Sequence, residues 1–477
     1  MNKNTTLIYN INIPEVLPDA EDIIRLFLKD YKRKSPSDFF LEQTITFESD
    51  TIKSIIKTNI NNNTKDFIDV EQFFYVQGTL QYSKHLKRFV KNALYKVLKN
   101  LTGKVLPWGS LTGIRPTRLA YELIENGIKD ELIKPILKKN FDISTPKLKL
   151  LAQILDAQKD IYTTDEKAVN LYVNIPVCTS RCSYCSFISS EVKKCRHLLD
   201  RYSDLVEQEI KFCFELIQSR GQYIRTVYIG GGTPTALAPA QLDKILSAVP
   251  KNTLEFTVEA GRPDTITKEK LDLLDFHNVT RISINPQTFS QNVLNTIGRG
   301  HTIEDFYTAY KMARDNYKFL INMDLIAGLP EDDLNSFKQS INRTLDLKPD
   351  NITVHTLALK SGSVLKQKDY NAYELIGDMV DFAYQKITAS SYSPYYLYRQ
   401  KNMLGNLENT GYCLQGKQCI NNIDTMEESI SVIACGAGAI SKRLYGGGKI
   451  ERSANVKNID EYINRFDEMK QRKAKLF

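Results

Sequence analysis

The chain has 477 residues, of which 42% are hydrophobic and 25% are charged, and its formal net charge at pH 7 is +8. This balance excludes a largely disordered chain, and the length predicts two to four domains. Because no stretch approaches the roughly 18 apolar residues of a membrane span and the first residues lack a signal-peptide core, we expect a cytoplasmic protein with reduced thiols.

Residues 1–165 are predicted to form an α+β domain. TTLIYNINIP from Thr5 and ESDTIKSIIKTNINN from Glu48 are typical of strands, and EDIIRLFLKDYK from Glu21 is typical of a helix. A basic amphipathic helix is predicted from Ser83 to a C-cap at Gly103. Its cations allow RNA binding, but the leucines and valine between them favour a packed helix with solvated charges, so nucleic acid is not expected among the partners.

Residues 168–360 alternate short β-branched runs with helical stretches, a pattern that predicts a parallel sheet with crossover helices. Two of the expected helices begin near Arg196 and Asp332. Six such units form an incomplete barrel or an open curved sheet, with functional residues at the carboxyl ends of the strands. The six predicted strands are 171–177, 225–231, 254–260, 280–286, 318–328 and 350–359.

Three cysteines at the spacing C-x3-C-x2-C, Cys178, Cys182 and Cys185, follow the first of these strands. Three thiolates can hold a cubane iron–sulfur cluster and leave one iron open to a small chelating ligand. A zinc site completed by a distant residue and plain buried thiols remain alternatives, although the second C-x2-C pair usual for zinc is missing. Cys413 and Cys419 are weaker candidates for a second metal or redox pair.

Polar residues and glycines follow the other strands. The run GGGTPT, residues 230–235, lets backbone approach a ligand closely because no Cβ intervenes. Glu259 and Asp324 are carboxylates at strand ends, suited to hydrogen-bonding a ribose diol. Gln287 and Arg299 lie in neighbouring loops, and arginine suits a carboxylate. Each alone is more typical of a cap or a surface position; together they predict a pocket for a nucleoside and a carboxylate beside the cysteines.

The motifs LYVNIPVCTSRCSYCSF and GGGTPT, with the polar residues at strand ends, resemble the radical S-adenosylmethionine (SAM) enzymes. Within them the chain is similar to the oxygen-independent coproporphyrinogen III oxidases, in the long clostridial and bacillar branch with an additional N-terminal domain. The resemblance covers residues 168–365 well and implies that Cys178, Cys182 and Cys185 ligate a [4Fe–4S] cluster whose fourth iron binds SAM. The implied SAM contacts are Tyr172, Gly231, Gly232, Thr233, Glu259, Gln287, Arg299, Asp324, Ala358 and Ile440.

The resemblance also implies an architecture and a reaction. The fold is α/β: an N-terminal α+β domain (1–165), a partial (β/α)6 TIM-like radical SAM core (166–365) and a mostly helical, substrate-covering domain (366–477). The implied reaction, in haem biosynthesis, turns coproporphyrinogen III propionates into vinyl groups by means of a 5′-deoxyadenosyl radical, with an electron donor such as flavodoxin or ferredoxin. Arg115, Arg118, Arg262, Lys360, Arg399 and Lys401 are candidates for binding the substrate's carboxylates.

Three departures from the oxidase pattern concern the substrate. Phe187 stands where the oxidases have a fourth cysteine, Asn174 replaces the histidine of Y-x-H-I-P, and Asn285 opens an N-P-Q stretch where the family often has G-V-Q. The haem-chaperone branch shares the phenylalanine but has a histidine–asparagine pair where this chain has Lys401 and Asn402. The alternatives are therefore another radical reaction on a tetrapyrrole, or a haem carrier with Tyr412 or Cys413 as axial ligand.

Overall fold

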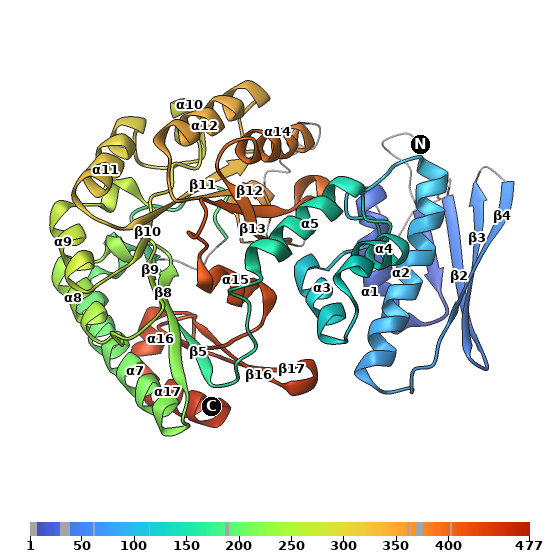
Figure 1. Ribbon diagram of the computed structural model, residues 1–477, viewed down its shortest axis with the longest axis horizontal. Helices are drawn as coiled ribbons and strands as arrows, with labels where there is room; N and C mark the ends of the chain where they lie inside the picture. Colours follow the sequence, from blue (N-terminus) through green and yellow to red (C-terminus); the bar gives the residue numbers. More distant parts are fainter. Residues whose placement is uncertain are drawn as a thin grey trace. The chain divides into compact units, whose positions relative to one another are not determined.

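The computed structural model describes residues 7–28, 39–60, 63–113, 115–186, 190–359, 362–367, 375–400 and 403–477. These residues form two compact units, one of 1–113 with 122–150 and one of 114–121 with 151–477 (Figure 1). The division of the second unit into a core and a substrate-covering domain stays a prediction. None of the helices in the described part of the chain has the length and hydropathy needed to cross a bilayer.

The first unit is a four-stranded sheet covered by helices, in the order β1-β2-β3-β4. β1 pairs parallel with β2, and the other pairs are antiparallel. The side chains of β3 alternate, so that Ile52 and Ile56 face the core together with Phe89 of α2. The strands are β1 (Leu7–Ile11), β2 (Phe39–Glu48), β3 (Thr51–Ile60) and β4 (Asn63–Gln72), and the helices include α1 (Leu17–Phe27), α2 (Leu80–Thr102) and α4 (Asp130–Phe141).

Helix α2 confirms the predicted basic amphipathic helix. It ends at Gly103, whose φ of 67° is the left-handed conformation that glycine adopts without strain. The cations of the helix contact groups of the same unit: Lys96 lies 2.6 Å from Asp69 and Lys99 lies 2.6 Å from Asp142. Further partners are Glu122 for Lys84, Asp19 for Lys87, Glu71 for Arg88 and Thr112 for Lys91. These contacts favour the packed helix over the phosphate-binding one.

The second unit is built on an 11-stranded sheet that contains all six predicted strands as parallel neighbours. The strands are almost continuously buried, as in parallel sheets with covered faces. In sheet order they are β5 (Ala168–Ile175), β8 (Tyr223–Gly231), β9 (Glu255–Val258), β10 (Arg281–Ser283), β11 (Leu320–Ala327) and β12 (Asn351–Thr356).

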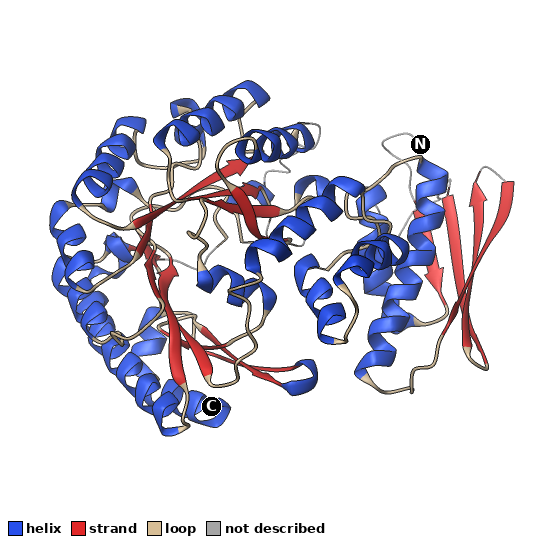
Figure 2. Cartoon of the chain, in the orientation of Figure 1, coloured by secondary structure: helices blue, strands red, loops and turns tan. Residues whose placement is uncertain are grey.

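The last hundred residues contribute strands as well as helices. β13 (Ser393–Tyr398) and β14 (Asn409–Cys413) extend the sheet beyond β12. On the other side β15 (Ser431–Cys435) pairs parallel with β5, followed by β16 (Ile440–Tyr445) and β17 (Lys449–Ala454). The prediction of a mostly helical segment missed these five strands, which flank the predicted six (Figure 2).

Helices line the outer face of the parallel strands, as Figure 1 shows. The predicted helices are confirmed as α7 and α12; Asp333 caps the amino end of α12, and its side chain accepts a hydrogen bond from the Ser336 N–H. The outer helices are α7 (Leu199–Ser219), α8 (Pro239–Ser247), α9 (Lys268–Phe276), α10 (Gln291–Thr296), α11 (Ile303–Asn316), α12 (Leu334–Leu347) and α14 (Ile376–Thr388). The others are α3 (Pro116–Glu125), α5 (Thr145–Gln158), α6 (Val192–Cys195), α13 (Val364–Gln367), α15 (Ile420–Glu427), α16 (Ile459–Asn464) and α17 (Phe466–Leu476), with short strands β6 (Val177–Cys178) and β7 (Ser190–Glu191).

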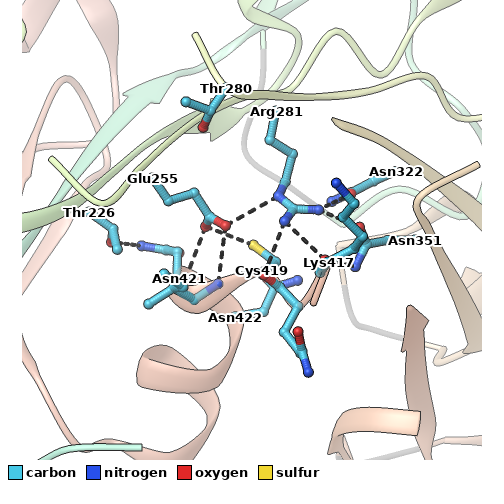
Figure 3. Close-up of polar contacts among 12 residues, drawn as sticks. Thr226, Glu255, Thr280, Arg281, Asn322, Asn351, Lys417, Cys419, Asn421 and Asn422 are labelled. Carbon is cyan, nitrogen blue, oxygen red and sulfur yellow. Dashed lines mark hydrogen bonds and ion pairs between the residues drawn. The ribbon is translucent and has the colours of Figure 1, made fainter. Parts of the chain in front are cut away.

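A polar network occupies the amino ends of β9 and β10 (Figure 3). Arg281, 1% exposed, donates to Glu255 at 3.2 Å and to the Lys417 carbonyl at 3.1 Å. The Cys419 thiol donates to Glu255 at 3.1 Å, and burial raises its pKa well above the ordinary value. The amino ends of these two strands are therefore filled by protein side chains.

Candidate functional site

The cysteine loop leaves the carboxyl end of β5. Cys178 belongs to β6, Cys182 is 6% exposed, and the Cys185 N–H donates to the Cys182 carbonyl at 3.1 Å. The Cys178 sulfur lies 3.4 Å from the Thr233 hydroxyl, which joins the loop to the glycine turn. Within the described residues, no three His, Cys, Asp or Glu side chains are arranged to hold a single metal ion; a cubane cluster distributes its sulfur ligands over separate irons.

The glycine turn packs so closely that side chains are excluded. A Cβ on Gly231 would lie 1.9 Å from the Asn174 Oδ1, and one on Gly232 would lie 2.4 Å from the Val177 carbonyl. Gly231 also has a φ of 101°, which other residues rarely adopt. These glycines bring the backbone at the end of β8 against β5 and the start of the cysteine loop; that the turn also approaches a ligand stays a prediction.

Glu259 is fixed immediately after β9. Its carboxylate accepts hydrogen bonds from the Tyr228 hydroxyl at 2.6 Å and from the Gly231 N–H at 3.2 Å. Burial raises the pKa of Glu259 to about 7, and the Tyr228 hydrogen bond offsets part of this rise. Tyr228 was not among the predicted residues; its position two places before Gly230 puts it on the same strand face, which is the signal that would have identified it.

Asp324 and Arg299 are both tied to Asn285. The Asn285 amide donates to the Asp324 carboxylate at 2.8 Å, and its Oδ1 accepts from the Asp324 N–H at 3.2 Å. Arg299 donates to the Asn285 carbonyl at 2.8 Å. Gln287, with a φ of 67°, bonds through its backbone to residues 324 and 326 of β11. Thus Asn285 connects two of the predicted SAM contacts, Asp324 and Arg299, and Gln287 is joined to Asp324 through the backbone.

His355 of β12 is a further polar residue beside this group. Its Nε2 lies 3.7 Å from the Asp324 carboxylate, and its Nδ1 lies 3.3 Å from the Tyr398 hydroxyl. The β-strand period puts residue 355 on the same face as Asn351 and Thr353. The sequence carried this signal, and the prediction missed it.

Asn174 joins the cofactor side of β5 to the glycine-rich loop after β15. Its amide donates to the Ala437 carbonyl at 2.5 Å, and its Oδ1 accepts from the Tyr172 hydroxyl at 3.2 Å. A buried pair supports the same loop from behind: Glu209 accepts from the Gly436 N–H and from Lys473, both at 2.6 Å. The loop that ends at Ile440 is therefore fixed to both β5 and α7.

Other predicted residues lie elsewhere or are less constrained. Ala358 bridges to Met403 beyond β12, and Ile440 is 52% exposed at the start of β16. Arg115 pairs with Glu428 at 3.2 Å and Arg118 with the Tyr162 hydroxyl at 2.8 Å. Glu428 precedes β15. Arg115 therefore lies at the amino ends of the strands, away from the cysteine loop, and the hypothesis that it reaches the site's rim is wrong.

The two alternative axial ligands, Tyr412 and Cys413, are each 2% exposed within β14. Cys413 and Cys419 are both free thiols. The Cys419 thiol donates to Glu255, and burial raises the pKa of the Cys413 thiol to about 12. Phe187, Lys360, Lys401 and Asn402 lie outside the described residues.

The described residues fit a cluster and SAM. The Cys182 sulfur is close to two cationic side chains, Arg262 and Arg299, which suit a thiolate. The buried Nε of Arg299 and both ring nitrogens of His301 lack hydrogen-bond partners among the described residues, and such buried donors are unusual without a ligand or water. The glycine turn packs its backbone against Asn174 and Val177, next to the start of the cysteine loop.

Comparison with known proteins identifies the class. Residues 172–342 match the Radical SAM superfamily. The chain therefore belongs to this superfamily, whose members use a [4Fe–4S] cluster and SAM. It is also 35% identical to the oxygen-independent coproporphyrinogen-III oxidase-like protein HemZ of Bacillus subtilis, over 95% of this chain and 94% of that protein. Within the superfamily, the chain belongs to the coproporphyrinogen-III oxidase-like proteins.

Two further relatives match part of the chain. The heme chaperone HemW of Bacillus subtilis is 31% identical over 61% of this chain and 74% of its own length. The solved structure of coproporphyrinogen III oxidase HemN from Escherichia coli has a TM-score of 0.51 and 22% identity, over 66% of this chain and 72% of that one. This likeness confirms the predicted α/β fold.

Proposed function

We propose that the protein catalyses the oxygen-independent oxidative decarboxylation of coproporphyrinogen III propionates to vinyl groups, giving protoporphyrinogen IX. The observation that carries the proposal is the similarity to a coproporphyrinogen-III oxidase-like protein over nearly the whole of both chains. The hydrogen-bonded connection of the cysteine loop, the glycine turn and Glu259 supports it. We further propose a low-potential donor such as flavodoxin or ferredoxin and a cytoplasmic location.

In this proposal Cys178, Cys182 and Cys185 ligate the cluster. When bound, the cluster and SAM supply a one-electron route to hydrogen abstraction. Glu259 offers its carboxylate to the ribose hydroxyls, since Tyr228 and Gly231 hold it in one orientation. Asp324 is oriented in the same way by Asn285.

The remaining proposed SAM contacts complete the pocket. Gly232 and Thr233 lie in the glycine turn, and Tyr172 is held by its hydrogen bond to Asn174. Further contacts are assigned by resemblance to Gln287, Arg299, Ala358 and Ile440. The substrate then loses a propionate hydrogen atom, CO2 and one electron, and the electron passes to an acceptor.

Most of the described candidates for binding the substrate's carboxylates already have protein partners. Arg262 pairs with Asp264, and Arg399 donates to the Leu407 carbonyl. A propionate bound by either arginine would have to compete with these contacts. We therefore assign no residue to the propionates.

A haem carrier is the second candidate, because the heme chaperone HemW is 31% identical to this chain. Axial ligation by Tyr412 or Cys413 would require opening the sheet around β14, where both side chains are buried. A different radical reaction on a tetrapyrrole is the third.

The deciding experiment is anaerobic turnover by the full-length chain. The cluster is reconstituted and reduced, SAM and coproporphyrinogen III are added, and products are followed by mass. Loss of two carboxyl groups in proportion to 5′-deoxyadenosine supports the proposal. Formation of 5′-deoxyadenosine without decarboxylation points to another substrate, and no 5′-deoxyadenosine from a loaded cluster favours the carrier.

A further inference from the structure

An arginine–aspartate pair lies directly against the cysteine loop. Arg262, 4% exposed, follows β9 three residues after Glu259. Its Nε lies 2.9 Å from one oxygen of Asp264 and its Nη2 lies 3.2 Å from the other. This fork-to-carboxylate geometry uses two of the guanidinium nitrogens and fixes the orientation of the third.

The pair holds the loop between its first two cysteines. The free nitrogen of Arg262, Nη1, donates to the Ser180 hydroxyl at 3.1 Å. The Thr179 hydroxyl in turn donates to Asp264 at 2.9 Å. Two consecutive loop residues are thus bound by the two members of one pair, in which Arg262 is buried and Asp264 is partly exposed. These contacts fix the loop that leads to Cys182.

The same nitrogen points at a cysteine sulfur. Nη1 of Arg262 lies 3.8 Å from the Cys182 Sγ, which is itself 6% exposed. Hydrogen bonds and charge at the sulfurs are among the features through which proteins set the potential of an iron–sulfur cluster. Reduction adds one negative charge to the cluster, so a nearby positive charge favours the reduced form and a nearby negative charge opposes it.

We propose that Arg262 and Asp264 act together as positioning residues that set the reduction potential of the cluster, through opposite electrostatic effects at Cys182. Arg262 raises the potential, and Asp264 limits that rise by partly neutralising the guanidinium. The inference rests on the proposed ligation by Cys178, Cys182 and Cys185, and it assigns the pair no contact with the substrate.

The direction in which each variant shifts the cluster's midpoint potential distinguishes this role from a purely mechanical one. If the pair only holds the loop, removing either member loosens the same contacts, and both variants change the cluster in the same direction. If the pair acts electrostatically, Arg262→Gln removes positive charge, whereas Asp264→Asn removes negative charge from beside an intact arginine. The midpoint potential of R262Q then falls below that of wild type, and the midpoint potential of D264N rises above it.

The test uses full-length, anaerobically reconstituted R262Q, D264N and R262K, with R314Q as control. Arg314 forms a similar pair with Asp350, at 2.9 Å, before β12 and at the opposite end of the sheet. Iron and sulfide content and the cluster's EPR spectrum establish loading, and an EPR-monitored redox titration without SAM gives the potential. We expect the reduction equilibrium to become about tenfold less favourable in R262Q and about tenfold more favourable in D264N, about 59 mV each for a one-electron couple.

R262K keeps the charge and loses the fork, so its potential is expected to stay closer to wild type than that of R262Q; R314Q is expected to show no shift. Equal potentials in R262Q, D264N and wild type, or shifts of the same sign, overturn the inference. If R262Q does not load a cluster, D264N decides: a raised potential supports the inference, and an unchanged or lowered one overturns it. A wild-type chain that loads no cluster instead refutes the proposed ligands.

Discussion

Replacing Glu259 by glutamine is expected to stabilise the apo-protein at neutral and alkaline pH while weakening its binding of SAM. Burial raises the pKa of this carboxyl from its ordinary 4.5 to about 7, with the charge of Asp324 adding to the rise. Between these two values the folded state binds the proton that the unfolded state releases. The carboxylate therefore opposes folding as pH rises through this window.

The shift from 4.5 to about 7 corresponds to about 3 kcal/mol at pH 8 and to about half of that at pH 5.5. These are upper values, because the side chain keeps some contact with solvent and glutamine loses one of the two acceptors that Tyr228 and Gly231 use. The expected gain of E259Q over wild type thus grows from pH 5.5 to pH 8. Urea titrations of the apo-proteins at several pH values measure it.

Glu427 provides a matched control. It is fully buried, and burial raises its pKa to about 7 as well. Its partner is Gln158, at 3.0 Å, and it lies before β15, at the amino end of the sheet. E427Q is expected to gain stability over the same pH window and to bind SAM as wild type does. A stability gain in E259Q that does not depend on pH would refute the assigned pKa, and unchanged SAM affinity would remove the ribose role.

Three further outcomes are expected. Asn174→Ala removes the hydrogen bonds to Tyr172 and Ala437 and should weaken SAM binding about tenfold, measured by calorimetry on the loaded protein. Asn170 lies on the same face of β5 at the other end of the strand, and Asn170→Ala should leave SAM binding unchanged. Lys473→Met leaves the Glu209 carboxylate buried without its cation and should cost about 3–5 kcal/mol, and adding Glu209→Gln should restore much of it. Cys182→Ala should abolish the reconstituted cluster's absorbance, and a persisting cluster would refute the ligand assignment.

The six parallel strands could be predicted because each joins a short apolar run to a turn, and parallel strands are buried on both faces. β4 could not, since its residues are mostly polar and none is fully buried; only pairing with β3 makes it a strand. β15 carried a signal that was overlooked. SVIAC followed by glycines repeats the strand-then-glycine pattern of residues 227–232, and both glycine turns close on β5.

Long-range pairs account for most of what sequence could not supply. The residues around Arg115 do not indicate whether it faces a substrate or Glu428, because the loops at the two ends of a parallel sheet have similar sequences. Arg281, Glu255 and Cys419 are separated by up to 164 residues and meet only once the sheet has formed. The strand period identifies which face a residue occupies but not which partner it finds there.

The two described departures from the oxidase pattern bear on the cofactor side of the site. Asn174 and Asn285 replace residues expected as histidine and glycine, and both make side-chain hydrogen bonds that a glycine could not make. Asn174 connects the strand of Tyr172 to the loop of Ala437, whereas Asn285 orients Asp324. Each amide donates a hydrogen bond to another segment of the chain, Asn174 to the Ala437 carbonyl and Asn285 to Asp324, so both side chains connect elements of this region. They are therefore compatible with SAM binding.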